Sequence, residues 1–256
     1  FIDTTRVEPE GPFGESHGHI ALEEYNMPMR ITAITRRQKA IVSSYISQVA
    51  PSESSVIKRV AYEPLFLRHL RDENNIKGIK KVSLHEPLTG LLRVTVITCD
   101  ANMPRTEIWR ALYSAAFFKG DCSKICIAVN EDIDVDNADA LLWAMSYRTN
   151  PSEDMQILPH RGQGHGPKRE HDGEEDSSVL IDATVKSPMP ALALPGKEYM
   201  ERAKDIWDEL GLPQLNVQMP WHGYSLGAWH QIWDDAGRRA AAGGYLENGR
   251  ISKEQA

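Results

Sequence analysis

Alternation of short apolar runs with amphipathic stretches constrains the fold of this chain more than any other feature. Residues 78–85 and 90–98 are rich in β-branched side chains and are joined by a Pro/Gly turn. Residues 106–118 have helical periodicity, residues 125–129 form a continuous apolar run, and a helix with acidic residues at its start is expected from residue 134. Strands interleaved with helices predict an α/β layer.

Residues 30–35 and 40–46 are further apolar, β-branched runs that predict two buried strands. Apolar residues at helical spacing predict a helix from Ser55 to about Asp72, which Pro64 is expected to bend or split. Residues 197–210 predict another helix, which Gly211 and Pro213 end.

Composition indicates a protein of ordinary soluble character. The 256 residues are 41% hydrophobic, and the formal net charge of −7 argues weakly against a nucleic-acid partner. No apolar run approaches the length of a membrane span. Three cysteines without zinc or redox spacing predict buried thiols in a reducing cytoplasm, namely Cys99, Cys122 and Cys126.

Two carboxylates lie five positions apart across a turn, in Glu10-Gly-Pro-Phe-Gly-Glu15. Gly11-Pro12 and Gly14 bend the backbone, so both side chains can face one cavity. Paired carboxyl groups in unlike surroundings can divide the roles of proton donor and anion. The alternative is a solvated acidic loop, because Gly-Pro turns flanked by Glu are common on surfaces.

The chain resembles the UbiD family of decarboxylases, which use prenylated flavin mononucleotide (prenylated FMN). The stretches that carry the resemblance are, in order, Glu10-Gly-Pro-Phe-Gly-Glu15 with His17-Gly18, Ile31 to Arg37, Lys124 to Val135, Trp143 to Arg148, and Leu180-Ile-Asp-Ala-Thr-Val-Lys186. The closest likeness is to the decarboxylases of hydroxylated aromatic acids.

The resemblance implies an α/β (α+β) fold with three parts. Residues 1–52 would complete a split-barrel domain that binds prenylated FMN, residues 53–75 would form a linker helix, and residues 76–256 would form an oligomerisation domain with a helical tail. Family members are about twice this long, and the chain begins at Phe1 rather than at a methionine. We therefore expect a C-terminal piece whose N-terminal half is a companion polypeptide, in a homo-oligomer without a membrane partner.

The resemblance also assigns roles. Prenylated FMN would promote reversible, non-oxidative loss of carbon dioxide from an aromatic, hydroxylated acid. Glu15 would donate the proton, and Glu10 would hold the acid network with an arginine outside this chain. Lys119 lies near a family lysine that contacts the flavin phosphate, although a solvated lysine at a helix end is an equal alternative. The divalent metal (Mn or Mg) and potassium would be held mainly by the N-terminal part, so no metal ligand is assigned here.

Two histidines, His160 and His165, fall where the family places residues that contact the substrate, and either could hydrogen-bond a phenolic hydroxyl. They lie in or beside a polar stretch, residues 161–178, that predicts either a solvated loop or a lid over a pocket. Two other functions stay open: a structural subunit without activity, and a metal hydrolase that uses the histidines.

Overall fold

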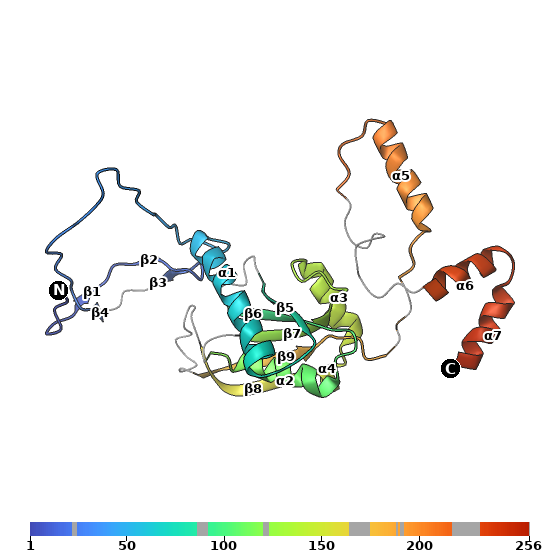
Figure 1. The fold of residues 1–256 in the computed structure, drawn as a ribbon, viewed down its shortest axis with the longest axis horizontal. Coiled ribbons are helices and arrows are strands. Elements are labelled where there is room, and N and C mark those ends of the chain that lie inside the picture. Colours follow the sequence, from blue (N-terminus) through green and yellow to red (C-terminus); the bar gives the residue numbers. More distant parts are fainter. Residues whose placement is uncertain are drawn as a thin grey trace.

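The computed structural model describes residues 1–21, 25–85, 92–119, 123–163, 175–187, 189, 192–216 and 231–255. Its centre is a five-stranded mixed sheet with helices against it (Figure 1). The strands are β5 (Ile79–Leu84), β6 (Val94–Cys99), β7 (Ile125–Asn130), β8 (Met155–Gly162) and β9 (Glu175–Asp182). Their spatial order is β5-β6-β7-β9-β8.

The three central strands, β6, β7 and β9, run parallel, whereas the edge strands β5 and β8 are antiparallel to their neighbours. Val94 pairs with Ile125, and Ile125 pairs in turn with Val179. Alternate residues of these strands point to opposite faces of the sheet, and both faces are buried. Continuous apolar runs therefore suit these strands better than polar alternation does.

Helices cover both faces. They are α1 (Glu53–Arg68), the π-helical turn η1 (His69–Glu73), α2 (Arg105–Ala116), α3 (Ala138–Arg148) and the single turn α4 (Pro151–Asp154). On one face, α1, η1 and α2 bury Phe66, Leu70 and Leu112 with Ile97. On the other face, α3 buries Leu141 with Ile127.

The expected α/β fold class is confirmed. The strands and helices predicted over residues 78–85, 106–118, 125–129 and 197–210 match β5, α2, β7 and the C-terminal helix α5 (Lys197–Glu209) within a few residues. The strand predicted over 90–98 corresponds to β6, although residues 86–91 lie outside the described residues.

Three predictions about secondary structure were wrong. The helix expected from Ser55 to about Asp72 is present as α1 and η1, but Pro64 does not split it: Pro64 lies inside α1 and is exposed. The stretches 30–35 and 40–46 form no strand, because the described residues offer them no sheet to join. The polar stretch 161–178 is not all loop, since its two ends belong to the antiparallel pair β8–β9.

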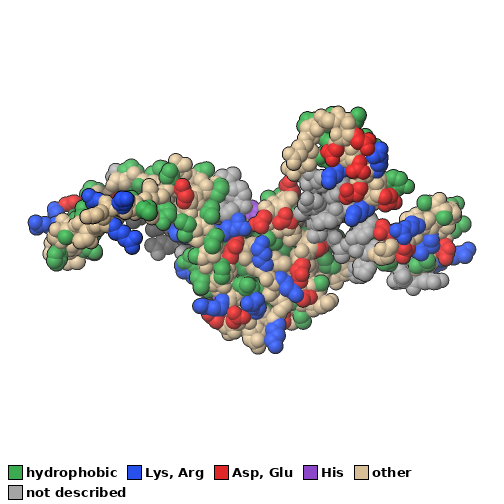
Figure 2. Space-filling model, turned by 45° about the horizontal axis from the view of Figure 1, so that its top comes forward, with side chains coloured by type: hydrophobic (Ala, Val, Ile, Leu, Met, Phe, Trp, Pro, Cys, Tyr) green, Lys and Arg blue, Asp and Glu red, His purple; other side chains and the backbone are tan. Residues whose placement is uncertain are grey.

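The N-terminal segment, residues 1–50, extends away from the central sheet (Figure 1). Two-residue pairs join β1 (Glu8–Pro9) to β4 (Tyr25–Asn26) and β2 (Phe13–Gly14) to β3 (Ile20–Ala21). Hydrophobic side chains are exposed along this segment (Figure 2), including Ile41 at 97% and Val42 at 85%. A large apolar surface of this kind indicates an interface rather than a solvent-facing exterior.

The C-terminal helices α5, α6 (Gln231–Ala241) and α7 (Tyr245–Gln255) also lie apart from the central sheet (Figure 1). None of the residues of α5 or α6 is buried, and α6 packs against α7. Most of the aromatic stretch 221–233 lies outside the described residues, but Trp233 is partly exposed on α6. No helix among the described residues is long and apolar enough to cross a membrane.

Candidate active site

The predicted carboxylates lie on small hairpins of the N-terminal segment. The backbone amide of Glu15 donates to the carbonyl of His19 (3.0 Å), and the amide of Gly18 donates to the carbonyl of Glu15 (2.9 Å). Gly18 has a φ of +84°, which a side chain would strain. These bonds close a tight turn over residues 15–19, which we call the carboxylate turn.

The two carboxylates have different surroundings. The Glu15 side chain is half-buried, and its Oε2 accepts a hydrogen bond from the backbone amide of Ser16 (3.2 Å). Glu10 is exposed and accepts a hydrogen bond from Asn26 Nδ2 on β4. The two carboxyl groups therefore differ in burial and in hydrogen-bond partner.

Glycines let the carboxylate turn lie directly on the backbone of residues 47–50. A Cβ atom on Gly14 would lie 2.2 Å from the carbonyl oxygen of Ser47. A Cβ atom on Gly18 would lie 3.0 Å from the backbone nitrogen of Ala50. No side chain fits at Gly14 without movement of the backbone, so the turn and residues 47–50 pack as one unit.

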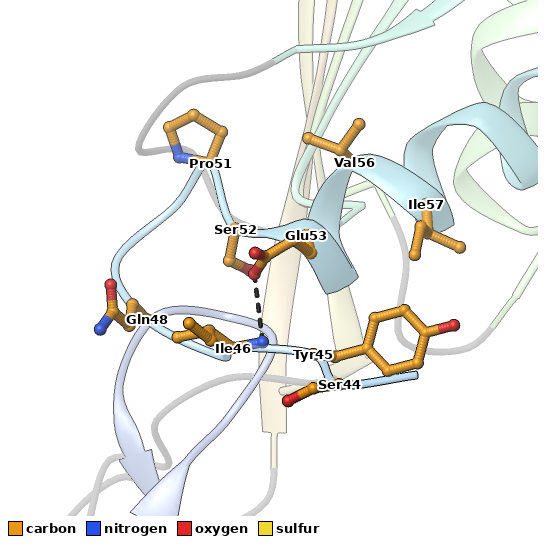
Figure 3. Close-up of a pocket in the computed structure, with 9 residues that line it drawn as sticks. All are labelled: Ser44, Tyr45, Ile46, Gln48, Pro51, Ser52, Glu53, Val56 and Ile57. Carbon is orange, nitrogen blue, oxygen red and sulfur yellow. Dashed lines mark hydrogen bonds between the residues drawn. The ribbon is translucent and has the colours of Figure 1, made fainter. Parts of the chain in front are cut away.

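A groove of about 650 Å³ opens beside this unit, between residues 44–48 and the start of α1 (Figure 3). Its walls include Tyr45, Ile46, Val56 and Ile57. Glu53 Oε2 accepts a hydrogen bond from the backbone amide of Ile46 (3.1 Å), drawn as a dashed line in Figure 3. The sequence did not predict this groove. Its two walls, residues 44–48 and the start of α1, face each other only because the chain turns back between them.

Lys119 lies just after α2 and is exposed. Its Nζ donates to the hydroxyl of Tyr62 on α1 (3.0 Å) and lies 5.1 Å from the centre of that ring. A lysine held in this way keeps its positive charge at the surface, which suits an anionic group such as a phosphate.

His160 lies on the edge strand β8, where the pairing with β9 shifts register between Leu158 and Arg161. Its φ is +58°, and its ring pairs with Glu175 Oε2 at 2.9 Å, with both side chains largely exposed. Substrate contact by His160 stays a prediction. His165 lies outside the described residues.

The motif Ile181-Asp-Ala-Thr-Val-Lys186 forms a buried polar cluster at the carboxyl end of β9. Asp182 is fully buried and accepts hydrogen bonds from the amide and hydroxyl of Thr184 (3.0 and 2.6 Å). Lys186 Nζ donates to the carbonyl of Arg148 (2.7 Å) and lies 3.3 Å from Asp154. The cluster ties β9 to α3 and α4, so we assign it to the stability of the fold.

Thiols and histidines give no sign of metal chemistry in the described part of the chain. Cys99 and Cys126 are buried, and burial, with the nearby Asp182 charge, raises the pKa of the Cys99 thiol to about 12. Across the described ranges, no group of three or more His, Cys, Asp or Glu side chains is arranged to hold a metal ion.

Comparison with known families identifies the class of protein. Residues 56–183, half of the chain, match the model of the 3-octaprenyl-4-hydroxybenzoate carboxy-lyase C-terminal domain. The fold thus defines a carboxy-lyase C-terminal domain preceded by a segment that carries the carboxylate turn. The chain belongs to the UbiD family, as the sequence motifs predicted.

Two curated relatives are uncharacterised archaeal proteins. One, from Aeropyrum pernix, is 23% identical over 222 residues, which are 83% of this chain and 44% of the relative. The other, from Archaeoglobus fulgidus, is 26% identical over 161 residues, which are 62% of this chain and 32% of the relative. The chain therefore spans less than half the length of these relatives.

Solved structures share the fold. The UbiD-class enzyme HmfF from Pelotomaculum thermopropionicum, in complex with FMN, superposes with a TM-score of 0.64 at 21% identity, over 79% of this chain and 45% of that one. Vanillic acid decarboxylase from Sedimentibacter hydroxybenzoicus, in closed form, superposes with a TM-score of 0.61 at 20% identity, over 80% and 44%.

Proposed function

We propose that this chain is the C-terminal part of a prenylated-FMN-dependent decarboxylase that acts reversibly on an aromatic, hydroxylated acid. The observation that carries the proposal is the carboxylate turn with its half-buried Glu15, which lies, with the exposed Glu10 before it, in the segment that precedes a UbiD C-terminal domain. A related structure holds prenylated FMN, and another is a vanillic acid decarboxylase.

Three residues of this chain fit the needs of such a reaction. The prenylated flavin, when bound, supplies the electron sink for the carbon that loses carbon dioxide. Glu15 holds a proton and delivers it to that carbon, and its partial exposure lets solvent return the proton afterwards. Glu10, which accepts a hydrogen bond from Asn26, would hold the acid network with an arginine outside this chain. Lys119 offers a cation to the flavin phosphate.

The partner that we propose is a polypeptide carrying the rest of the flavin-binding domain, with the divalent metal and potassium sites. Support comes from the relatives, of which this chain covers 44% and 32%. The exposed apolar side chains of residues 31–49 are the surface that such a partner would cover. The domain built on the central sheet would join copies of the enzyme, and the buried thiols of Cys99 and Cys126 suit work in the reducing cytoplasm.

Replacement of Glu15 by Gln tests the proposal. Gln keeps the size of the side chain but cannot donate a carboxylic proton, so kcat for carbon dioxide release from a hydroxylated benzoic acid should fall at least about 100-fold. The visible absorbance of the bound flavin and the thermal midpoint should stay unchanged.

Glu8→Gln is the matched control, because Glu8 lies in the same segment, is exposed and pairs with Arg6. It should keep full turnover. If Glu15→Gln retains turnover in a flavin-loaded enzyme, Glu15 is not the proton donor. That result would favour the alternative that this chain is a structural subunit without activity of its own.

A further inference from the structure

A side chain of helix α1 reaches the carboxylate turn. Lys58 Nζ donates a hydrogen bond to the hydroxyl of Ser16 at 2.8 Å, across 42 positions of sequence. Ser16 is only 5% exposed, and Lys58 is half-buried. An ammonium donor makes a charge-assisted bond, which is stronger than a bond between neutral groups.

Ser16 connects this ammonium to the proposed proton donor. Its hydroxyl accepts from Lys58, while its backbone amide donates to Glu15 Oε2 at 3.2 Å. The carboxylate of Glu15 and the ammonium of Lys58 are therefore held by the same buried residue. Movement of Ser16 would move the Glu15 carboxylate with it.

The backbone on the opposite side leads back into the same helix. Gly14 and Gly18 lie against residues 47–50, and that stretch continues to Ser52, which caps α1. Among the described residues, close backbone contact with residues 47–50 and the side chain of Lys58 both hold the turn. Both holds belong to α1 or to the residues that lead into it.

We propose that Lys58 is a positioning residue that fixes the Glu15 carboxyl group relative to α1 by holding Ser16. The proposal rests on the proposed function of Glu15 as proton donor. Lys58 itself transfers no proton to the substrate. Its importance follows from geometry, because proton transfer requires heavy atoms within hydrogen-bond reach and small displacements slow a reaction strongly.

Kinetics of the flavin-loaded enzyme test this role. Lys58→Met keeps most of the length of the stem but removes the donor, so kcat should fall about tenfold or more, with KM changed less than about twofold. Lys58→Arg keeps a cationic donor and should restore at least about half of the activity. Arg68→Met, on the same helix, removes a cation that pairs with exposed Glu73 and should change neither constant.

A double-mutant cycle shows whether Lys58 acts through Ser16. Ser16→Ala should lower kcat about as much as Lys58→Met, and the double variant should be no slower than either single variant. Multiplied losses in the double variant would mean that the two residues act separately, which would overturn the proposal.

Amide hydrogen exchange gives a readout that needs no flavin and no turnover. The amides of Glu15 and Gly18 close the carboxylate turn, so in Lys58→Met they should exchange about tenfold faster, while amides of the central sheet keep their rates. Arg68→Met should leave all these rates unchanged. Unchanged exchange at the turn in Lys58→Met would refute the positioning role.

The two proposals fail in different ways. If Glu15→Gln stays active but Lys58→Met loosens the turn, the contact stands and the assignment of Glu15 as donor falls. If Glu15→Gln is inactive but Lys58→Met retains full kcat and normal exchange, the assignment of Glu15 as proton donor is supported. The positioning role of Lys58 is then refuted.

Discussion

His85 shows how a single buried residue can make the stability of this protein depend on pH. It follows β5, is 9% exposed, and its backbone amide donates to the carbonyl of Val94 (3.1 Å). Burial lowers the pKa of His85 below its usual 6.5, and the charge of Arg59 lowers it further, while Asp136 opposes them. The folded protein therefore disfavours the protonated imidazole.

Stability should fall as the pH drops below 6.5. The unfolded chain takes up a proton at His85 near pH 6.5, whereas the folded protein takes it up only at lower pH, so protonation favours unfolding across that interval. Urea midpoints at pH 7.5 and pH 5.5 measure this effect. His85→Gln should reduce the difference between the two midpoints, and an unchanged difference would assign it to other groups.

The sequence predicts the candidate site residues better than the contacts that support them. Glu10-Gly-Pro-Phe-Gly-Glu15 indicates a bent backbone with two carboxylates, and the structure has both on turns with unlike surroundings. The support from Lys58 was not predictable, because nothing in the sequence links position 58 to position 16. Contact between them depends on how residues 47–52 return the chain into α1.

At the scale of elements, the contact of the carboxylate turn with residues 47–50 depends on the absence of side chains. Gly14→Ala places a methyl group 2.2 Å from the carbonyl oxygen of Ser47, so the turn must move away. We expect faster amide exchange at Gly18 and at least about a tenfold loss of kcat. Gly11→Ala is the control, since a Cβ atom there meets nothing within 4 Å.

Equal effects of the two alanine variants would contradict this prediction, because they would reflect the general stiffening of a glycine position. A loss confined to Gly14→Ala would instead identify the close approach of the two backbones as the cause.

Secondary structure was predicted well where packing and periodicity agree. Strand β7 and helix α2 belong to the central layers, where apolar runs meet a sheet or a helix face. Strand β8 was missed, because Pro159 and the charged residues around it do not look like a strand, and the register shift there accommodates them. The apolar run 40–46 was predicted as a strand, yet it finds no pairing partner among the described residues.

At the scale of the whole molecule, two parts flank the central sheet, and their described residues contribute to neither hydrophobic core (Figure 1). In the N-terminal part, Ile34, Ile41 and Val42 are more than 80% exposed. At the other end, the amphipathic helix α5 has no buried residue. Surfaces of this kind are costly in water, so we expect assembly to cover them.

Charged substitutions in the N-terminal part should weaken that assembly. Ile41→Asp with Val42→Asp would place two carboxylates in the proposed interface, and light scattering after size exclusion should show loss of the proposed companion polypeptide. The thermal midpoint of the sheet domain should not change. Leu142→Asp, at a residue 59% exposed on α3, is the control and should leave the assembly intact. Retention of the companion by the double variant would place the interface elsewhere.

The raised pKa of the buried Cys99 thiol makes its alkylation a measure of when the central sheet opens. Alkylating reagents attack the thiolate, and a thiol with a pKa near 12 at 0% exposure offers almost none at neutral pH. Modification at Cys99 must therefore wait until β6 separates from its neighbours. Peptide-resolved labelling at this single position would time the opening of the central layers without any engineered probe.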